Sequence, residues 1–139
     1  MAMPVERRSF LASLVAMATG SLGARAAQSP HPSPRPGVDG SKVLAVDQLD
    51  RKEAAPVFDQ VRRIPEIADG IRCHCGCAER PGYRSLLSCF EGDGMAQMCE
   101  ICQGQARLAA TMHRFRRPLD KIREAIDRQF HGPERRRPP

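Results

Sequence analysis

Six cysteines lie between Cys73 and Cys102, and no other position of the chain carries one. The first three occupy alternate positions in Cys73-His74-Cys75-Gly76-Cys77. Cys89 follows, and then the closely spaced pair Cys99 and Cys102. Thiolates are the ligands that soft metal ions prefer, and two thiols can also oxidise to a disulfide. The spacing therefore predicts either a soft-metal site or a disulfide framework.

The metal interpretation makes use of every cysteine. Six thiolates exceed the four of a closed zinc site, so their number fits a small multinuclear Cu(I)–thiolate centre. A Zn(II) site bound by four cysteines fits nearly as well, with the other two cysteines left free or joined in a disulfide. An iron–sulfur cluster is a weaker alternative. The candidate ligands are Cys73, Cys75, Cys77, Cys89, Cys99 and Cys102, with His74 and Met98 as lesser candidates. In an extended segment the ring of His74 is expected to point away from its neighbouring thiols.

Two alternatives use the thiols differently. Bridging Cys73 to Cys75, or Cys75 to Cys77, is sterically poor, so a disulfide-stapled interaction module would pair these three with the downstream cysteines. A thiol–disulfide oxidoreductase would instead use Cys99 and Cys102, because the first of them lies near a predicted helix start that lowers a thiol pKa. The sequence shows no catalytic triad, phosphate loop or paired carboxylates, and it favours a binding protein over an enzyme.

The segments around the cysteines predict an all-α fold, a small cysteine-rich domain of three to four helices over residues 43–131. Apolar residues at helical spacing predict helices over 54–63, from about 96 to 115, and over 119–130. Shorter turns of helix are expected after Pro65 and over 85–90. The apolar run Val43-Leu44-Ala45-Val46 predicts a strand or an arm laid across the domain.

The helix expected over 96–115 has two different faces. Its predicted core stripe consists of Ile101, Leu108, Met112 and Phe115. Cys99 and Cys102 lie on a second face with small alanines, where we expect them to meet the Cys73–Cys77 loop. His113 shares that second face, but it lies roughly 16 Å along the helix from Cys102 and is predicted to stay outside the site.

Residues 1–26 have the features of a twin-arginine-type signal peptide. Arg7-Arg8 precede Phe10-Leu11 and an apolar run, and Ala24-Arg25-Ala26 offers a small-residue cleavage site. That run is shorter than the roughly 20 residues needed to cross a bilayer, so the mature chain is expected to have no transmembrane span. The predicted location is the periplasm or extracytoplasmic space, with a metal ion and another metal-handling protein as partners.

Composition narrows the function further. The 139-residue chain carries a formal charge of +6, but its aromatic content of 4% is too low for base-stacking platforms, so no nucleic-acid partner is expected. The same scarcity limits the core and favours a metal or disulfide staple. Alternating prolines over residues 27–42 predict an extended linker in which His31 is solvated. Residues 132–139 predict a basic disordered tail.

The stretch Ile71–Phe130 resembles a family of small exported bacterial proteins marked by a Pro-Cys-Tyr-Cys-Gly-Cys motif. The matching residues are Cys73, Cys75, Gly76, Cys77, Ser85-Leu86, Cys89-Phe90 and the pair Cys99 and Cys102. This chain departs from the motif at Arg72, where the family has proline, and at His74, where it has tyrosine. The resemblance implies an extracytoplasmic, thiol-rich helical domain that binds metal, and it implies no particular activity.

Overall fold

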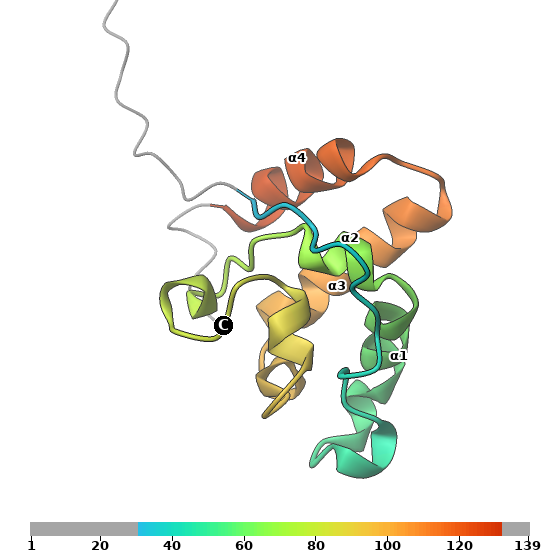
Figure 1. Cartoon of the computed structure of the whole chain (residues 1–139), viewed down its shortest axis with the longest axis vertical. Coiled ribbons are helices and arrows are strands. Elements are labelled where there is room, and N and C mark those ends of the chain that lie inside the picture. Colours follow the sequence, from blue (N-terminus) through green and yellow to red (C-terminus); the bar gives the residue numbers. More distant parts are fainter. Residues whose placement is uncertain (1–30, 132–139) are drawn as a thin grey trace, which may run out of the picture.

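The computed structural model describes residues 31–131 (Figure 1). The predicted signal peptide, the start of the predicted linker and the predicted tail lie outside the described residues. The described chain is all-α, as predicted, and contains no strand. Its α-helices are α1 (Ala55–Arg63), α2 (Pro65–Asp69), α3 (Glu100–Arg114) and α4 (Leu119–Phe130). Short 3-10 helices are η1 (Val46–Gln48), η2 (Lys52–Ala54), η3 (Cys77–Glu79), η4 (Leu87–Phe90) and η5 (Met95–Met98).

Proline and glycine set several helix boundaries where the sequence predicts them. Pro65 opens α2, and Pro118 immediately precedes α4. The fixed φ of proline suits the start of a helix, where its missing N–H needs no partner. Gly70 follows the last residue of α2, so the first cysteines lie just past a helix end.

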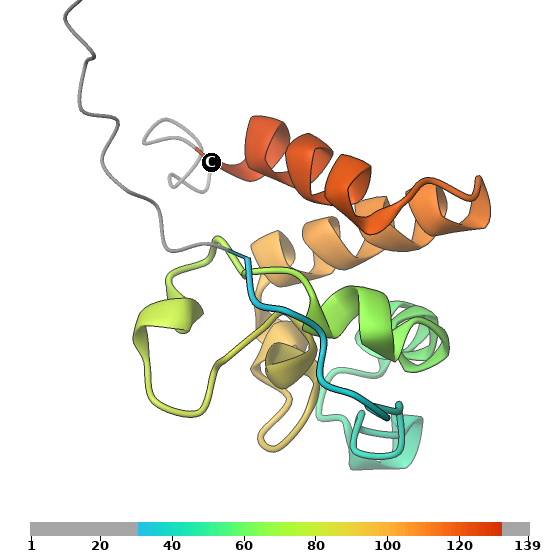
Figure 2. The same ribbon diagram turned by 45° about the horizontal axis from the view of Figure 1, so that its top comes forward.

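Helix α3 is the central element, in contact with α1, α2 and α4. Helices α3 and α4 run alongside each other as a hairpin (Figure 2). The buried residues of α3 are Cys102, Gln105, Ala106 and Ala109. They follow the spacing of a single helical face, and their small side chains let neighbouring segments approach closely. On α4, Ile122 and Ile126 are fully buried and form its inner face.

The predicted core stripe on the long helix is wrong. Phe115 is 67% exposed, and Leu108 and Met112 are only partly buried. The buried face is instead the one that carries Cys102, because the cysteine loop and α4 cover it. The helix also begins later than predicted, since the backbone of Cys99 is extended and separates η5 from α3.

Aromatic and aliphatic side chains from α1 and η4 form the rest of the core. The rings of Phe58 and Phe90 meet edge to face, with centroids 4.7 Å apart. Leu44 N donates a 3.1 Å hydrogen bond to Phe90 O, and Val43 is buried. The apolar run beginning at Val43 is therefore an arm across the domain, one of the two predicted forms.

Residues 31–35 lie against the helical domain, between α4 and the end of α2 (Figure 1). Arg123 Nη2 on α4 donates a 2.8 Å hydrogen bond to Pro32 O. The side chain of His31 is only 15% exposed and its Nε2 lies 3.0 Å from Asp127 Oδ1, so its prediction as a solvated linker residue is wrong. An extended proline-rich backbone leaves its carbonyls unpaired, and here the arginines of the domain bind them.

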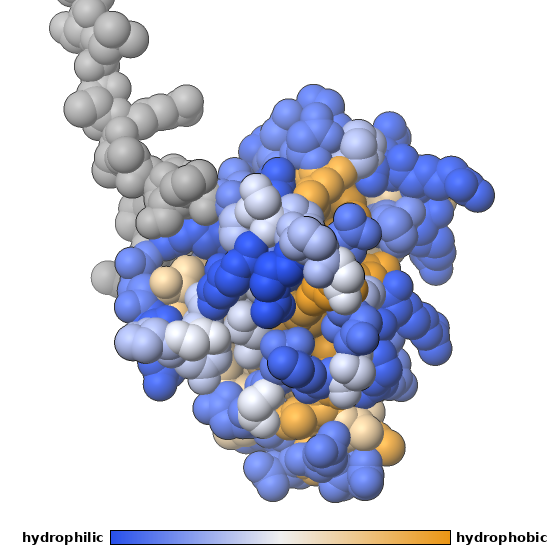
Figure 3. Space-filling model, viewed as in Figure 1, coloured by the Kyte–Doolittle hydropathy of each residue, from blue (hydrophilic) through white to orange (hydrophobic). Residues whose placement is uncertain are grey.

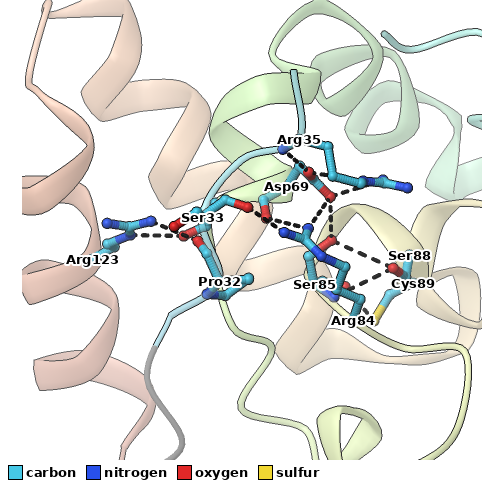
Figure 4. A network of polar contacts seen from close by, with 10 residues as sticks. Pro32, Ser33, Arg35, Asp69, Arg84, Ser85, Ser88, Cys89 and Arg123 are labelled. Atoms are coloured by element: carbon cyan, nitrogen blue, oxygen red, sulfur yellow. Dashed lines mark hydrogen bonds and ion pairs between the residues drawn. The ribbon is translucent and has the colours of Figure 1, made fainter. Parts of the chain in front are cut away.

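A buried carboxylate fastens this segment to the domain (Figure 4). The Asp69 side chain is fully buried at the end of α2. It accepts hydrogen bonds from Arg35 N and Nη2 at 2.8 and 2.9 Å, from Arg84 Nη1 at 2.8 Å and from Ser85 Oγ at 3.0 Å. Burial alone would raise the pKa of Asp69, but the hydrogen bonds from Arg35 outweigh it and lower the pKa.

The surface is mainly hydrophilic on the face seen in Figure 3, where apolar side chains emerge in a seam between charged ones. The large apolar side chains most exposed in the described chain are Val46, Met98 and Phe115. Among residues 31–131, no helix combines the length and the apolar character that crossing a bilayer requires.

We predict that Asp69→Asn destabilises the fold by about 2 kcal/mol at neutral pH, because it removes a buried charge that two arginines share. The pKa of Asp69 is lowered in the fold, so its contribution is present above about pH 4 and is lost as the pH falls through the folded-state pKa. Urea unfolding should therefore show a difference in the free energy of unfolding between wild type and Asp69→Asn, and this difference should become smaller in acid. The exposed control Asp47→Asn should change stability by less than about 0.5 kcal/mol. An equal loss in both variants would contradict the assignment.

Candidate metal centre

The first three cysteines lie on the loop that follows α2. Leu86 N donates a 2.7 Å hydrogen bond to Ile71 O and holds the start of this loop. Gly76 has a φ of 94°, a left-handed conformation that glycine adopts without strain, as predicted. The turn at Gly76 leads into η3 and leaves the Sγ atoms of Cys75 and Cys77 2.6 Å apart.

The last two cysteines lie at the start of α3. Cys99 is the N-cap residue, and its Sγ accepts a 3.5 Å hydrogen bond from Cys102 N. Cys102 lies in the first turn and is fully buried. Its side chain faces the Cys73–Cys77 loop, so the predicted meeting of the helix pair with this loop is confirmed.

Cys102 is the centre of a compact group of sulfurs. Its Sγ lies 3.3 Å from Cys73 Sγ and 3.5 Å from Cys75 Sγ, and the latter two are 3.3 Å apart. Cys89, from η4, completes a set of four sulfurs that all lie within 4.8 Å of one another. Zinc–sulfur bonds of about 2.3 Å in a tetrahedron place neighbouring sulfurs about 3.8 Å apart, so this set has the size of a metal–thiolate site.

The six cysteines gather in one place, and all are free thiols. Cys77 and Cys99 lie at the periphery of the four-sulfur set, beside Cys75 and Cys102 respectively. Cys75 and Cys99 are partly exposed, whereas the other four are buried. The cluster therefore has an interior and an opening to solvent.

Met95 is the methionine that contacts the cluster, and this corrects the prediction of Met98. Met95 Sδ lies 3.4 Å from Cys77 Sγ and 3.8 Å from Cys102 Sγ. Met98 is 64% exposed. The 3-10 geometry of η5 turns the two methionines differently from the α-helix that the sequence predicts at this point.

Gln105 closes the buried side of the cluster, and the sequence analysis did not identify it. Its Oε1 accepts hydrogen bonds from Cys73 Sγ at 3.2 Å and from His74 N at 3.0 Å. Its Nε2 donates to Arg72 O at 3.3 Å. Gln105 lies three residues after Cys102 on the same helical face, and that spacing is the signal that could have identified it.

Neither the candidate ligand His74 nor His113 lies among the sulfurs. The ring of His74 points to the other side of the loop, where its Nε2 lies 2.8 Å from Asp127 Oδ1. The ring therefore points away from the thiols, as predicted, although His74 and Cys75 lie in a turn and not in an extended segment. His113 is exposed on α3, outside the cluster, as predicted.

The clustered thiols share their protons unevenly. Hydrogen bonds from Cys102 and then Cys75 hold the pKa of Cys73 far below its usual range. The pKa of Cys75 falls to about 3, chiefly through a hydrogen bond from Cys102. The pKa of Cys102 is raised because Cys73 and then Cys75 hold its proton as acceptors. Burial raises the pKa of Cys77 to about 12. The packed thiols therefore differ widely in how readily each one gives up its proton.

No family model, curated protein or solved structure matches this chain. The resemblance of Ile71–Phe130 to the exported family therefore stays a prediction.

We predict that Gln105→Leu destabilises the fold by about 2–4 kcal/mol, because it leaves the His74 N–H and the Arg72 carbonyl without their buried partner. Urea unfolding measures the loss, and faster hydrogen exchange at the His74 amide locates it. The control Gln60→Leu, at an exposed position of α1, should stay within about 0.5 kcal/mol of wild type. Unchanged exchange at His74 in Gln105→Leu would contradict this role.

Proposed function

We propose that the protein is an exported soft-metal binding protein that holds Cu(I) or Zn(II) in its six-thiol cluster. Metal storage, delivery or resistance are the roles that such a site would serve. The observation that carries the proposal is the set formed by Cys73, Cys75, Cys89 and Cys102, whose sulfurs all lie within 4.8 Å of one another. Their nearest sulfur separations are close to those of a tetrahedral thiolate site.

Cu(I) is the cation that the surroundings of the cluster favour. A thioether is a good ligand for Cu(I) and a poor one for zinc, and Met95 Sδ lies next to two of the sulfurs. Six thiols also provide more ligands than one zinc ion uses. Zn(II) bound by four cysteines is the second candidate.

The location supports the same proposal. The sequence signal predicts export by the twin-arginine route, which carries folded proteins. A metal could then enter the cluster in the reducing cytosol, before the thiols meet an oxidising compartment. The partner that we propose is another metal-handling protein of the extracytoplasmic space.

A thiol–disulfide oxidoreductase is the alternative with a structural observation in its favour. Cys99 is the N-cap of α3, where the helix dipole stabilises a thiolate. Hydrogen bonding with Cys102 also lowers the pKa of Cys99, but the neighbouring Cys75 and burial outweigh it and raise the pKa. A reactive nucleophile needs the opposite shift, so metal binding remains the proposed function.

We predict that protein matured through its native export route carries Cu or Zn at one or more ions per chain. Removing the metal with a chelator should lower the midpoint of thermal unfolding, because an ion that binds only the folded state stabilises it. Cys75→Ser should reduce the bound metal at least about tenfold, and His113→Asn should leave it unchanged. Metal analysis and thiol titration provide the measurements. Three disulfides without metal would overturn the proposal in favour of a stapled interaction module.

Met95→Leu separates the two metals. We predict that it weakens Cu(I) binding about tenfold, because the thioether is lost, and leaves Zn(II) affinity unchanged. Competition with chelators specific for each ion measures both affinities. The matched control Met98→Leu, at an exposed position, should change neither. Equal Cu(I) affinity in wild type and Met95→Leu would show that Met95 only fills space beside the sulfurs.

A further inference from the structure

A second cluster of metal-binding side chains lies on the other side of the cysteine loop. The chain has four histidines, and two of them, His31 and His74, converge on the carboxylate of Asp127. His31 comes from the extended N-terminal segment, His74 from the cysteine loop, and Asp127 from α4. The ligand atoms of these three residues all lie within 4.8 Å of one another. None of them belongs to the thiol cluster.

The geometry of this cluster is convergent. Asp127 Oδ1 lies 3.0 Å from His31 Nε2 and 2.8 Å from His74 Nε2. The two rings meet edge to face, with centroids 6.1 Å apart. The Nε2 atom of each ring points at the carboxylate of Asp127. The ring of His131 follows directly after α4, with its centroid 5.5 Å from that of His74. It brings a further imidazole to the same place.

We propose that His31, His74 and Asp127 form a second metal site, which binds a borderline divalent cation such as Zn²⁺ or Cu²⁺. Imidazole and carboxylate are the ligands that these ions accept, and three protein ligands with one open position make a recognised coordination set. The thiol cluster selects soft ions, so the two sites differ in the metal that they prefer.

Burial and charge are compatible with such a site. The His74 side chain is 5% exposed and that of Asp127 is 38% exposed, so the rings are held in place while solvent and ions reach the carboxylate. The cationic side chain of Arg72 acts on His74, and its ion pair with Glu79 offsets part of its repulsion of a metal ion. The carboxylate of Asp127 supplies the negative charge that attracts the ion.

Binding requires a defined movement of protons. In the metal-free arrangement Arg72 N donates to Nδ1 of His31 at 2.9 Å, so the neutral ring carries its proton on Nε2 and donates it to Asp127. An ion bound at Nε2 takes the place of that proton, and the ring then carries its proton on Nδ1. His31 therefore gives up the hydrogen bond from the Arg72 amide when the ion binds. The loss of this hydrogen bond changes the environment of the Arg72 amide, which gives a spectroscopic signal specific to the site.

Titration of the full mature chain with Co²⁺ tests the proposal. Co²⁺ bound by nitrogen and oxygen gives visible bands without the near-ultraviolet charge transfer that thiolate ligands produce, so the two sites are counted separately. We expect one Co²⁺ per chain to bind with visible bands and without a thiolate band. The same Co²⁺ binding should be retained in Cys75→Ser. His74→Asn and Asp127→Asn should weaken its binding at least about tenfold, and His113→Asn should not. Because Cys75→Ser disrupts the thiol cluster alone, Co²⁺ binding that this variant retains belongs to the histidine–carboxylate site, even if the thiol cluster binds no metal.

Nitrogen-15 spectra of the wild-type protein with Zn²⁺ give a second test, which does not depend on how the variants fold. The Nε2 resonances of His31 and His74 should shift on binding, and the Arg72 amide should lose its hydrogen-bonded shift. Co²⁺ or Zn²⁺ binding that leaves these resonances unchanged would overturn the proposal. So would an Asp127→Asn variant that folds and binds Co²⁺ with the affinity of the wild type.

Discussion

The close approach of several buried sulfurs around Cys102 is the constraint on which the rest of the structure depends. Thiols this close cannot all ionise, because neighbouring thiolates repel one another in a medium of low polarity. They must share protons or hold a cation. The loop after α2, the helix η4 and the start of α3 are all arranged to bring the sulfurs to one point. The lowered pKa of Cys73 and of Cys75 follows chiefly from the hydrogen bonds that Cys102 makes with them.

Polar contacts replace part of the apolar core that a chain this poor in aromatic residues lacks. Helix α3 buries small and polar side chains, among them Gln105, where a larger domain would bury leucine. Asp69 and Asp127 are two carboxylates that fix the N-terminal segment to the helices, one through arginines and the other through histidine. Small domains of this composition gain much of their stability from such networks or from a bound ion.

One local feature separates two kinds of metal chemistry. At the start of the turn that contains Gly76, the side chain of His74 points away from the thiols of Cys73 and Cys75. The two thiols face Cys102, and the imidazole of His74 faces Asp127. A soft cluster and a nitrogen–oxygen cluster thus lie back to back on the same few residues. The thiol cluster and the second site that we propose therefore share no ligand.

The sequence by itself determined the helices that begin at or just after a proline and the confinement of all six cysteines to residues 73–102, because both can be read from the order of residues along the chain. Only the tertiary structure decided which face of α3 is buried, since the cysteine loop covers Cys102 and leaves Phe115 exposed. It also decided the place of His31, whose partner Asp127 lies far along the chain. Contacts between distant segments depend on how the helices pack, and a pattern within one segment carries no information about that packing.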